Sequence, residues 1–186
     1  EIMPSLVGSG DVYKRQRYDN SIVYRTPSFA GFQVAAQYSF KMNGQEEVHT
    51  RANQRYAALG ATYKNGPFAA GLIVDSIFNT NTATETNTED TLGVTLGASY
   101  DFEVVKLFAM AQYGTHESKI GRTATNEEQG MKGYTFSLGA TAPVLGGTAY
   151  AQANYLTAKA NEETADGNKE KQENWGIALG YSYNLS

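Results

Sequence analysis

The sequence predicts an all-β chain that folds as an antiparallel, up-and-down transmembrane β-barrel. Three observations favour this fold class. Apolar and polar residues alternate along many short segments, tight turns and long polar loops alternate between the segments, and aromatic residues cluster at the segment ends. Thirteen tyrosines and nineteen glycines beside four prolines are typical of β structure. No apolar run approaches the roughly 20 residues of a membrane helix, so a membrane crossing would use strands.

The clearest alternation lies in residues 91–113, TLGVTLGASYDFEVVKLFAMAQY. Six apolar side chains share one face of a predicted strand over 92–102, and five small or polar residues share the other face. After a short connection at Glu103 and Val104, a second strand over 105–113 repeats the pattern. Two strands of about ten residues joined by a tight turn predict a β-hairpin.

The same alternation predicts strands along the rest of the chain. Pro27 and Gly31 interrupt the first pair, and tight turns are expected at Asn65-Gly66-Pro67 and at Leu145-Gly146-Gly147. The nine predicted strands are about Tyr18–Thr26, Phe32–Phe40, Arg55–Lys64, Phe68–Phe78, 92–102, 105–113, Tyr134–Val144, Thr148–Thr157 and Trp175–Leu185.

The connections between these strands alternate strictly between tight turns and long polar loops. Of the seventeen acidic residues after Gln16, thirteen lie in the long loops beside eight basic residues, a net charge of −5. A soluble sandwich has no reason to place every long connection at one end, whereas an outer-membrane barrel has short periplasmic turns and long external loops. The four predicted loops are about Lys41–Asn53, Asn79–Asp90, Thr115–Lys132 and Ala158–Asn174.

Aromatic residues gather near both ends of the predicted strands, while the strand middles on the same face hold Ala, Val, Leu and Ile. A general preference of aromatics for strands does not predict clustering at both ends, but two interfacial belts do. The belt near the tight turns would contain Tyr24, Phe29, Phe32, Tyr63, Phe68, Tyr100, Phe102 and Tyr183. The belt near the long loops would contain Tyr38, Phe40, Phe78, Tyr113, Tyr134, Tyr155 and Trp175.

Residues 1–16, EIMPSLVGSGDVYKRQ, show neither the strand nor the helix period, and they lack the features of a signal peptide. We predict that they form a non-native leader of the kind a translated sequencing adapter would leave. An irregular natural segment is the alternative. Residues 17–186 carry the β pattern and are expected to form the barrel part of the chain.

Composition and motifs indicate no enzyme, no cofactor and no metal site. The chain has no cysteine, and its two histidines lie in polar stretches. A net charge of −4 gives no basic surface for nucleic acid. No nucleophile elbow, phosphate-binding loop or EF-hand spacing is present. Asp101 and Glu103 could suggest paired carboxylates, but a solvated turn is the favoured interpretation.

Four segments resemble the trimeric general-diffusion porins of Gram-negative outer membranes, in the 16-stranded neisserial-type family. They are RYDNSIVYRTPSFAGFQVAAQYSF, YAALGATYKNGPFAAGL, VKLFAMAQYG and the terminal WGIALGYSYNLS. The resemblance covers roughly 170 residues and implies that residues 17–186 are a partial porin barrel similar to strands six to fourteen. The signal peptide, the first five strands, the inward-folded third loop and the last two strands would then be missing. The sequence departs from the family at Val23, where a basic residue is frequent, and Arg25 two residues on shares its predicted face.

The resemblance implies a water-filled outer-membrane channel for passive diffusion of ions and small hydrophilic solutes, a homotrimer when full length, with outer-membrane lipid around it. Strand parity points five charged residues inward as candidates for lining the pore. Three of them, Lys64, Asp101 and Lys106, could instead be paired or extend to water at the rim. The candidate pore-lining residues are Arg25, Lys64, Asp75, Asp101 and Lys106.

Two other functions remain open from the sequence. A non-conducting outer-membrane barrel could act through its external loops as an adhesin or structural anchor. A long acidic loop in the sequence upstream would favour the pore instead. A soluble β-sandwich binding module would bury the apolar face in an internal core. Partition of the full-length protein into detergent micelles would separate the membrane barrel from the sandwich.

Overall fold

The structure is a computed structural model that describes residues 18–42, 54–78, 89–117, 130–161 and 171–183. These residues form one nine-stranded sheet in which every strand pairs antiparallel with its sequence neighbours. The predicted all-β, antiparallel, up-and-down arrangement is therefore confirmed, while the predicted leader at 1–16 lies outside the described residues. The strands are β1 (Ser21–Arg25), β2 (Phe32–Ser39), β3 (Arg55–Asn65), β4 (Phe68–Phe78), β5 (Leu92–Asp101), β6 (Lys106–Glu117), β7 (Met131–Val144), β8 (Gly147–Ala160) and β9 (Lys171–Tyr183).

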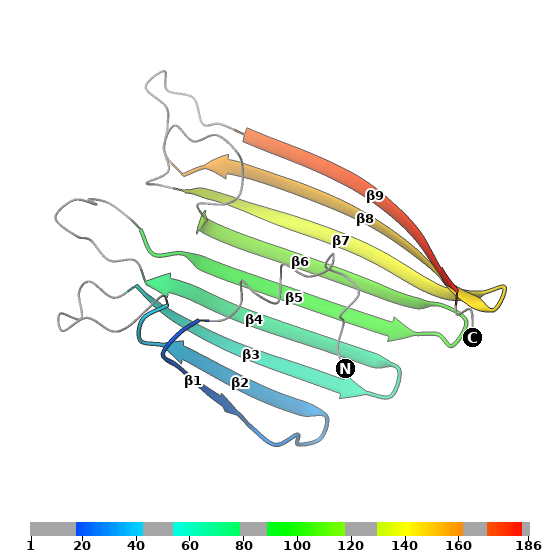
Figure 1. Cartoon of the computed structure of the whole chain (residues 1–186), viewed down its shortest axis with the longest axis horizontal. Coiled ribbons are helices and arrows are strands. Elements are labelled where there is room, and N and C mark those ends of the chain that lie inside the picture. Colours follow the sequence, from blue (N-terminus) through cyan, green and yellow to red (C-terminus); the bar gives the residue numbers. More distant parts are fainter. Residues whose placement is uncertain (1–17, 43–53, 79–88, 118–129, 162–170, 184–186) are drawn as a thin grey trace.

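The sheet is curved, and its two edge strands are not paired with each other (Figure 1). The connections β1–β2, β3–β4, β5–β6 and β7–β8 all lie at one end of the sheet, where β9 also ends. The strand ends that lead into the predicted long loops lie at the opposite end. No helix long and apolar enough to cross a membrane occurs in the described part of the chain.

The first strand is shorter than predicted, because β1 covers Ser21–Arg25 and not Tyr18–Thr26. Asn20 has a φ of 50°, a left-handed conformation that interrupts the ladder. Pro27 follows Thr26 and has no backbone N–H to donate. Pairing still continues irregularly beyond the strand, since Phe40 N–H donates to Asn20 O at 3.1 Å.

The strands that border two of the predicted long loops extend further than the sequence indicated. β6 continues to Glu117 and β8 to Ala160, whereas the loops were expected to begin near Thr115 and Ala158. β9 likewise begins at Lys171, four residues before Trp175. The apolar–polar alternation fades in these segments because both faces are polar or small, yet backbone pairing needs no apolar face. The point at which the alternation ends in the sequence is therefore the end of the apolar band and not the end of the strand.

The tight turns have the left-handed residues that two-residue hairpins require. Between β3 and β4 the central residues are Gly66 and Pro67, and only Gly66 has a positive φ, at 55°. A positive φ at the first central residue alone matches the type II′ pattern. Between β7 and β8, Leu145 and Gly146 have φ values of 47° and 78°. Positive φ at both central positions matches type I′, so both predicted turns are confirmed.

We expect Gly31→Ala to destabilise the full-length protein more than Gly66→Ala does. Both residues have positive φ, which costs an L-residue about 1–2 kcal/mol. A Cβ at Gly31 would also come within 2.3 Å of the Lys64 carbonyl oxygen, whereas a Cβ at Gly66 would meet nothing within 4 Å. Thermal unfolding of the two variants measures the difference. Equal unfolding temperatures for the two variants would show that the backbone at Gly31 and Lys64 can move apart to accommodate the added Cβ.

The two faces of the sheet differ in polarity along most of the strands. One face carries mostly apolar side chains and remains uncovered, as shown by exposed fractions of 65% for Leu138, 75% for Trp175 and 81% for Leu179. Among the described residues only two hydrophobic side chains are buried, Met42 and Ala158. A β-sandwich would bury this face against a second sheet. The sandwich alternative is therefore not supported.

Candidate functional site: the polar concave face

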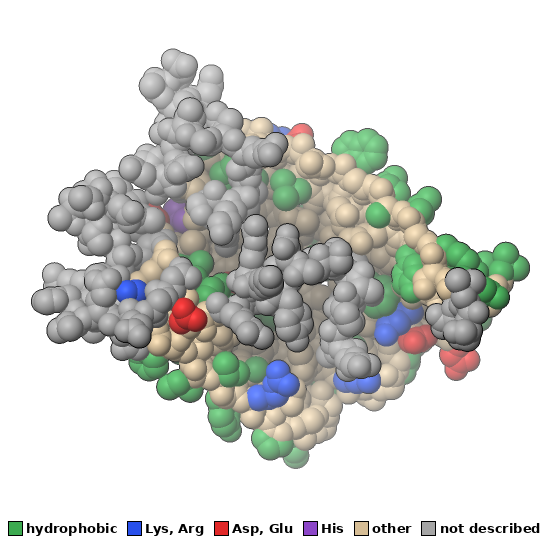
Figure 2. Space-filling view, in the orientation of Figure 1, with side chains coloured by type: hydrophobic (Ala, Val, Ile, Leu, Met, Phe, Trp, Pro, Cys, Tyr) green, Lys and Arg blue, Asp and Glu red, His purple; other side chains and the backbone are tan. Residues whose placement is uncertain are grey.

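The polar face of the sheet is its concave side. Along β2 the apolar-face residues Phe32, Val34 and Ala36 are exposed, while Gln33 and Ala35 between them are half-buried. Side chains crowd together on the inside of a curved sheet and spread apart on its outside, so this alternation indicates the curvature. Figure 2 shows a hollowed face, with basic (blue) and acidic (red) side chains among polar surface and hydrophobic side chains around its outline.

All five sequence-predicted charged residues lie on this polar face. Lys64 is opposite Ala69, and Asp75 is opposite Ala58 and Gly93. In the register, both residues lie on the face that their position along the alternating strand pattern predicts. Arg25, Lys64, Asp101 and Lys106 lie near the tight-turn end, and Asp75 lies nearer the other end.

Of the five predicted charged residues, the structure brings two into direct register with each other. Asp101 and Lys106 are direct cross-strand partners at the end of the β5–β6 hairpin. Asp101 Oδ1 accepts the Glu103 backbone N–H at 2.9 Å, and Phe102 N–H donates to Val105 O at 2.9 Å. The Asp101 carboxylate thus caps the turn at Glu103, whose φ is 71°. This is the turn role that was favoured over a pair of catalytic carboxylates.

Asp75 lies in a second, separate part of the face. Its carboxylate lies near the Tyr56 side chain on β3, because Tyr56 pairs with Ile77, two residues along β4 from Asp75. The same carboxylate covers Gly93, since Asp75 Oδ1 is 2.7 Å from the position that a Cβ on Gly93 would take. Glycine at this position therefore leaves room for the carboxylate. Asp75 borders a groove of about 330 Å³ over β5, β6 and β7.

Three aromatic residues of this face, Tyr56, Phe108 and Tyr150, were not predicted as part of the site from the sequence. Phe108 shares the face with Lys106, and the Lys106 ammonium lies 5.4 Å from the centre of its ring. A large apolar residue with polar parity, as at Phe108 and Met110, is the signal that could have identified this part of the wall. Polar side chains beside them satisfy one another, as Gln112 donates to Thr95 Oγ1 at 3.2 Å and Gln152 to Asn154 Oδ1 at 2.7 Å.

The described residues contain no group of three or more His, Asp or Glu side chains that could hold a metal. The polar face presents amides, hydroxyls, glycine backbone and a few fixed charges to solvent, together with apolar side chains such as Ile73. Such a surface suits transient contact with water, ions and polar solutes.

Aromatic residues form clusters on the apolar face at both ends of the strands. At the tight-turn end, Phe32 and Tyr63 have ring centres 4.4 Å apart, and Tyr100 and Phe102 are 4.5 Å apart. At the opposite end, the rings of Tyr134 and Phe136 are 5.7 Å apart. Interfacial aromatic belts flank an apolar band in this way in outer-membrane barrels.

A single curved sheet with an uncovered apolar convex face, aromatic clusters at both ends and a polar concave face defines part of the wall of a membrane β-barrel. The chain matches the Gram-negative porin family over residues 4–186. It therefore belongs to this family, and its location is the outer membrane. The resemblance to Gram-negative porins drawn from the sequence is confirmed.

Two curated relatives agree with this assignment. The chain is 31% identical to an outer membrane porin protein of Bordetella pertussis, over 91% of the chain and 49% of that protein. It is 32% identical to outer membrane porin protein 32 of Delftia acidovorans, over 91% of the chain and 43% of that protein. The chain thus spans about half the length of these relatives.

Proposed function

We propose that the full-length protein is a homotrimeric, water-filled channel through which ions and small hydrophilic solutes diffuse passively. The observation that carries this proposal is the contrast in polarity between the two faces along most of the strands; on β4 the concave face also carries Ile73 and Ile77 beside Asp75. The apolar convex face suits hydrocarbon, and the polar concave face suits an aqueous lumen. Membership in the porin family supports a channel and fits a protein without enzymatic activity. The trimer rests on the family resemblance alone.

The proposed pore-lining residues are the charged side chains of the polar face. A fixed charge in a narrow aqueous passage attracts ions of opposite sign and repels ions of its own sign. Lys106 gives the most direct test because its ammonium forms no ion pair within the described residues and lies over the Phe108 ring. The complete proposed set is Arg25, Lys64, Asp75, Asp101 and Lys106.

We expect Lys106→Glu in the full-length protein to shift the reversal potential toward cation preference. Replacing a positive by a negative charge changes the energy of an ion about 8 Å away by roughly 1 kcal/mol in water before salt screening. Because the cation gains and the anion loses about this energy, the ratio of cation to anion permeability should rise by up to about thirtyfold before salt screening, and by several-fold with it. The reversal potential under a KCl gradient in a planar bilayer measures this ratio.

Lys132→Glu provides the matched control. Lys132 has the parity of the apolar face, lies toward the other end of the sheet and undergoes the same change of charge. Its reversal potential should remain that of the parent protein. An unchanged reversal potential in Lys106→Glu would place Lys106 outside the conduction path. A full-length protein that inserts but conducts no ions would favour the anchor or adhesin function.

A further inference from the structure

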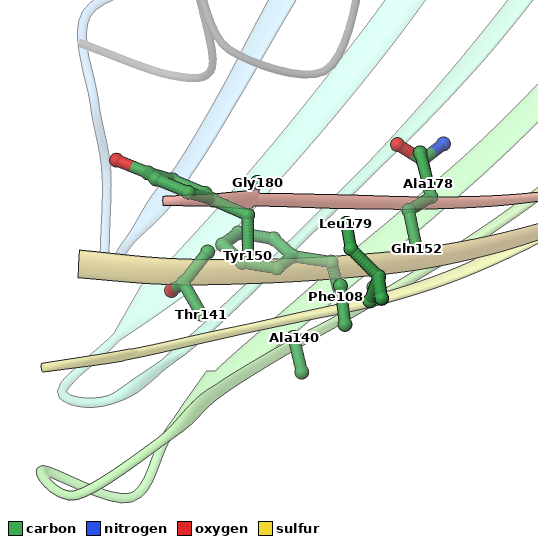
Figure 3. A pocket seen from close by; sticks show the side chains of 10 residues that line it. Phe108, Ala140, Thr141, Tyr150, Gln152, Ala178, Leu179 and Gly180 are labelled. Carbon is green, nitrogen blue, oxygen red and sulfur yellow. The ribbon is translucent and has the colours of Figure 1, made fainter. Parts of the chain in front are cut away.

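A depression in the polar face lies between two aromatic side chains on β6 and β8. Phe108 and Tyr150 line it from either side of β7, and its volume is about 210 Å³. Figure 3 shows Tyr150 and Gln152 on one side of the sheet and Leu179 on the opposite side. The depression therefore opens on the face proposed to line the lumen.

The strand register explains why the depression is open. Gly139 on β7 lies directly between Phe108 and Gln152, and it contributes no side chain. A Cβ at Gly139 would lie 3.9 Å from the Phe108 Cβ, in the space between the two flanking strands. Gly180 on β9 lies opposite Tyr150 and leaves the other side of that ring equally open. The two glycines thus give a flat backbone floor beside two rings.

The charge beside this floor is positive. The Lys106 ammonium lies 5.4 Å from the Phe108 ring centre, and Lys106 pairs in register with Thr141, which also lines the depression. Asp101 is the nearest acidic residue in register, but its Oδ1 accepts the Glu103 N–H. No ion pair joins Asp101 to Lys106 in the described part of the chain. The Lys106 charge is therefore available to an anion in the depression.

We propose that this depression is a binding subsite for small aromatic carboxylates, an inference that rests on the proposed channel function. The flat body of such a solute fits over Gly139, in contact with the Phe108 and Tyr150 rings. Aromatic pairs of this kind add a stabilisation beyond simple burial. The solute carboxylate meets the Lys106 ammonium, which makes a charge-assisted contact. A saturated or uncharged solute would lose one of the two contacts.

Benzoate is the probe that tests the subsite. The full-length protein in a planar bilayer is first shown to conduct in KCl, and its single-channel current is then recorded with added benzoate or acetate. We expect benzoate to reduce and modulate the current at concentrations at which acetate has no effect. Phe108→Leu and Tyr150→Leu, which remove a ring but retain an apolar side chain, should each weaken the benzoate effect about three- to tenfold.

Phe136→Leu is the matched control, because it makes the same change on the apolar face, where Phe136 is 50% exposed. Its benzoate effect should equal that of the parent protein. Equal responses to benzoate and acetate, or unchanged benzoate block in both ring variants, would overturn the subsite while KCl conductance still supports the channel. Failure to conduct in KCl would overturn the proposed channel function itself. The KCl conductance is recorded before benzoate is added, so the two failures are distinguishable.

Discussion

Leu96→Arg is expected to lower the folding stability of the full-length protein in a bilayer by about 2–4 kcal/mol, whereas Thr95→Arg should be tolerated. Leu96 lies on the apolar face in the middle of β5, is 52% exposed and pairs with Leu72 and Ala111. An arginine there would place its charge in hydrocarbon, where water cannot solvate it.

Thr95 is the matched control because it is the next residue on the same strand. It faces the polar side, where its Oγ1 accepts a hydrogen bond of 3.2 Å from Gln112. An arginine at Thr95 would lose this bond, worth about 0.5–1.5 kcal/mol, but its charge would remain in water. A urea refolding titration into lipid vesicles measures both variants. Equal loss of stability would contradict the assignment of the convex face to lipid.

Strand parity is the part of the fold that the sequence predicted best. A period of two residues assigns each side chain to one face once a single position is fixed. The sequence alone therefore places Leu96 and Thr95 on opposite faces, and the register confirms both positions. The same reasoning placed Lys106 and Asp75 on the polar face.

The strand ends were predicted less well because backbone pairing does not require an apolar face. β9 begins at Lys171, where an ion pair with Glu173 lies on an exposed surface. Such a segment has the polarity of a loop but can continue a ladder wherever water reaches both sides. At β1 the limit is the left-handed Asn20, a conformation that the alternation of side chains does not reveal.

The candidate site depends on pairs of residues that are distant in sequence. Phe108 and Tyr150 border one depression because β6, β7 and β8 pair in one particular register. Tyr56 and Asp75 likewise lie near each other because of the β3–β4 register, which pairs Tyr56 with Ile77. Parity predicts that such residues share a face, but it does not predict which of them meet.

The largest functional effect is expected when these 186 residues are purified alone: they should give no stable, porin-sized conductance steps. The described strands form one sheet in which β1 pairs only with β2, and β9 only with β8. With nine alternating strands, β1 and β9 run in the same direction, so joining them would need a parallel seam. Bacterial single-chain barrels have even strand numbers and no such seam.

An open sheet is costly in lipid because its edges carry backbone groups without partners. Each such group costs several kcal/mol in hydrocarbon. Nine strands forced into a closed barrel would enclose a narrow lumen, since barrel diameter grows with strand number. Planar-bilayer recordings of the purified 186-residue chain and of the full-length protein test this directly. Steps of equal size and lifetime from both would show that the short chain closes a pore, by itself or with further copies, and would contradict the prediction.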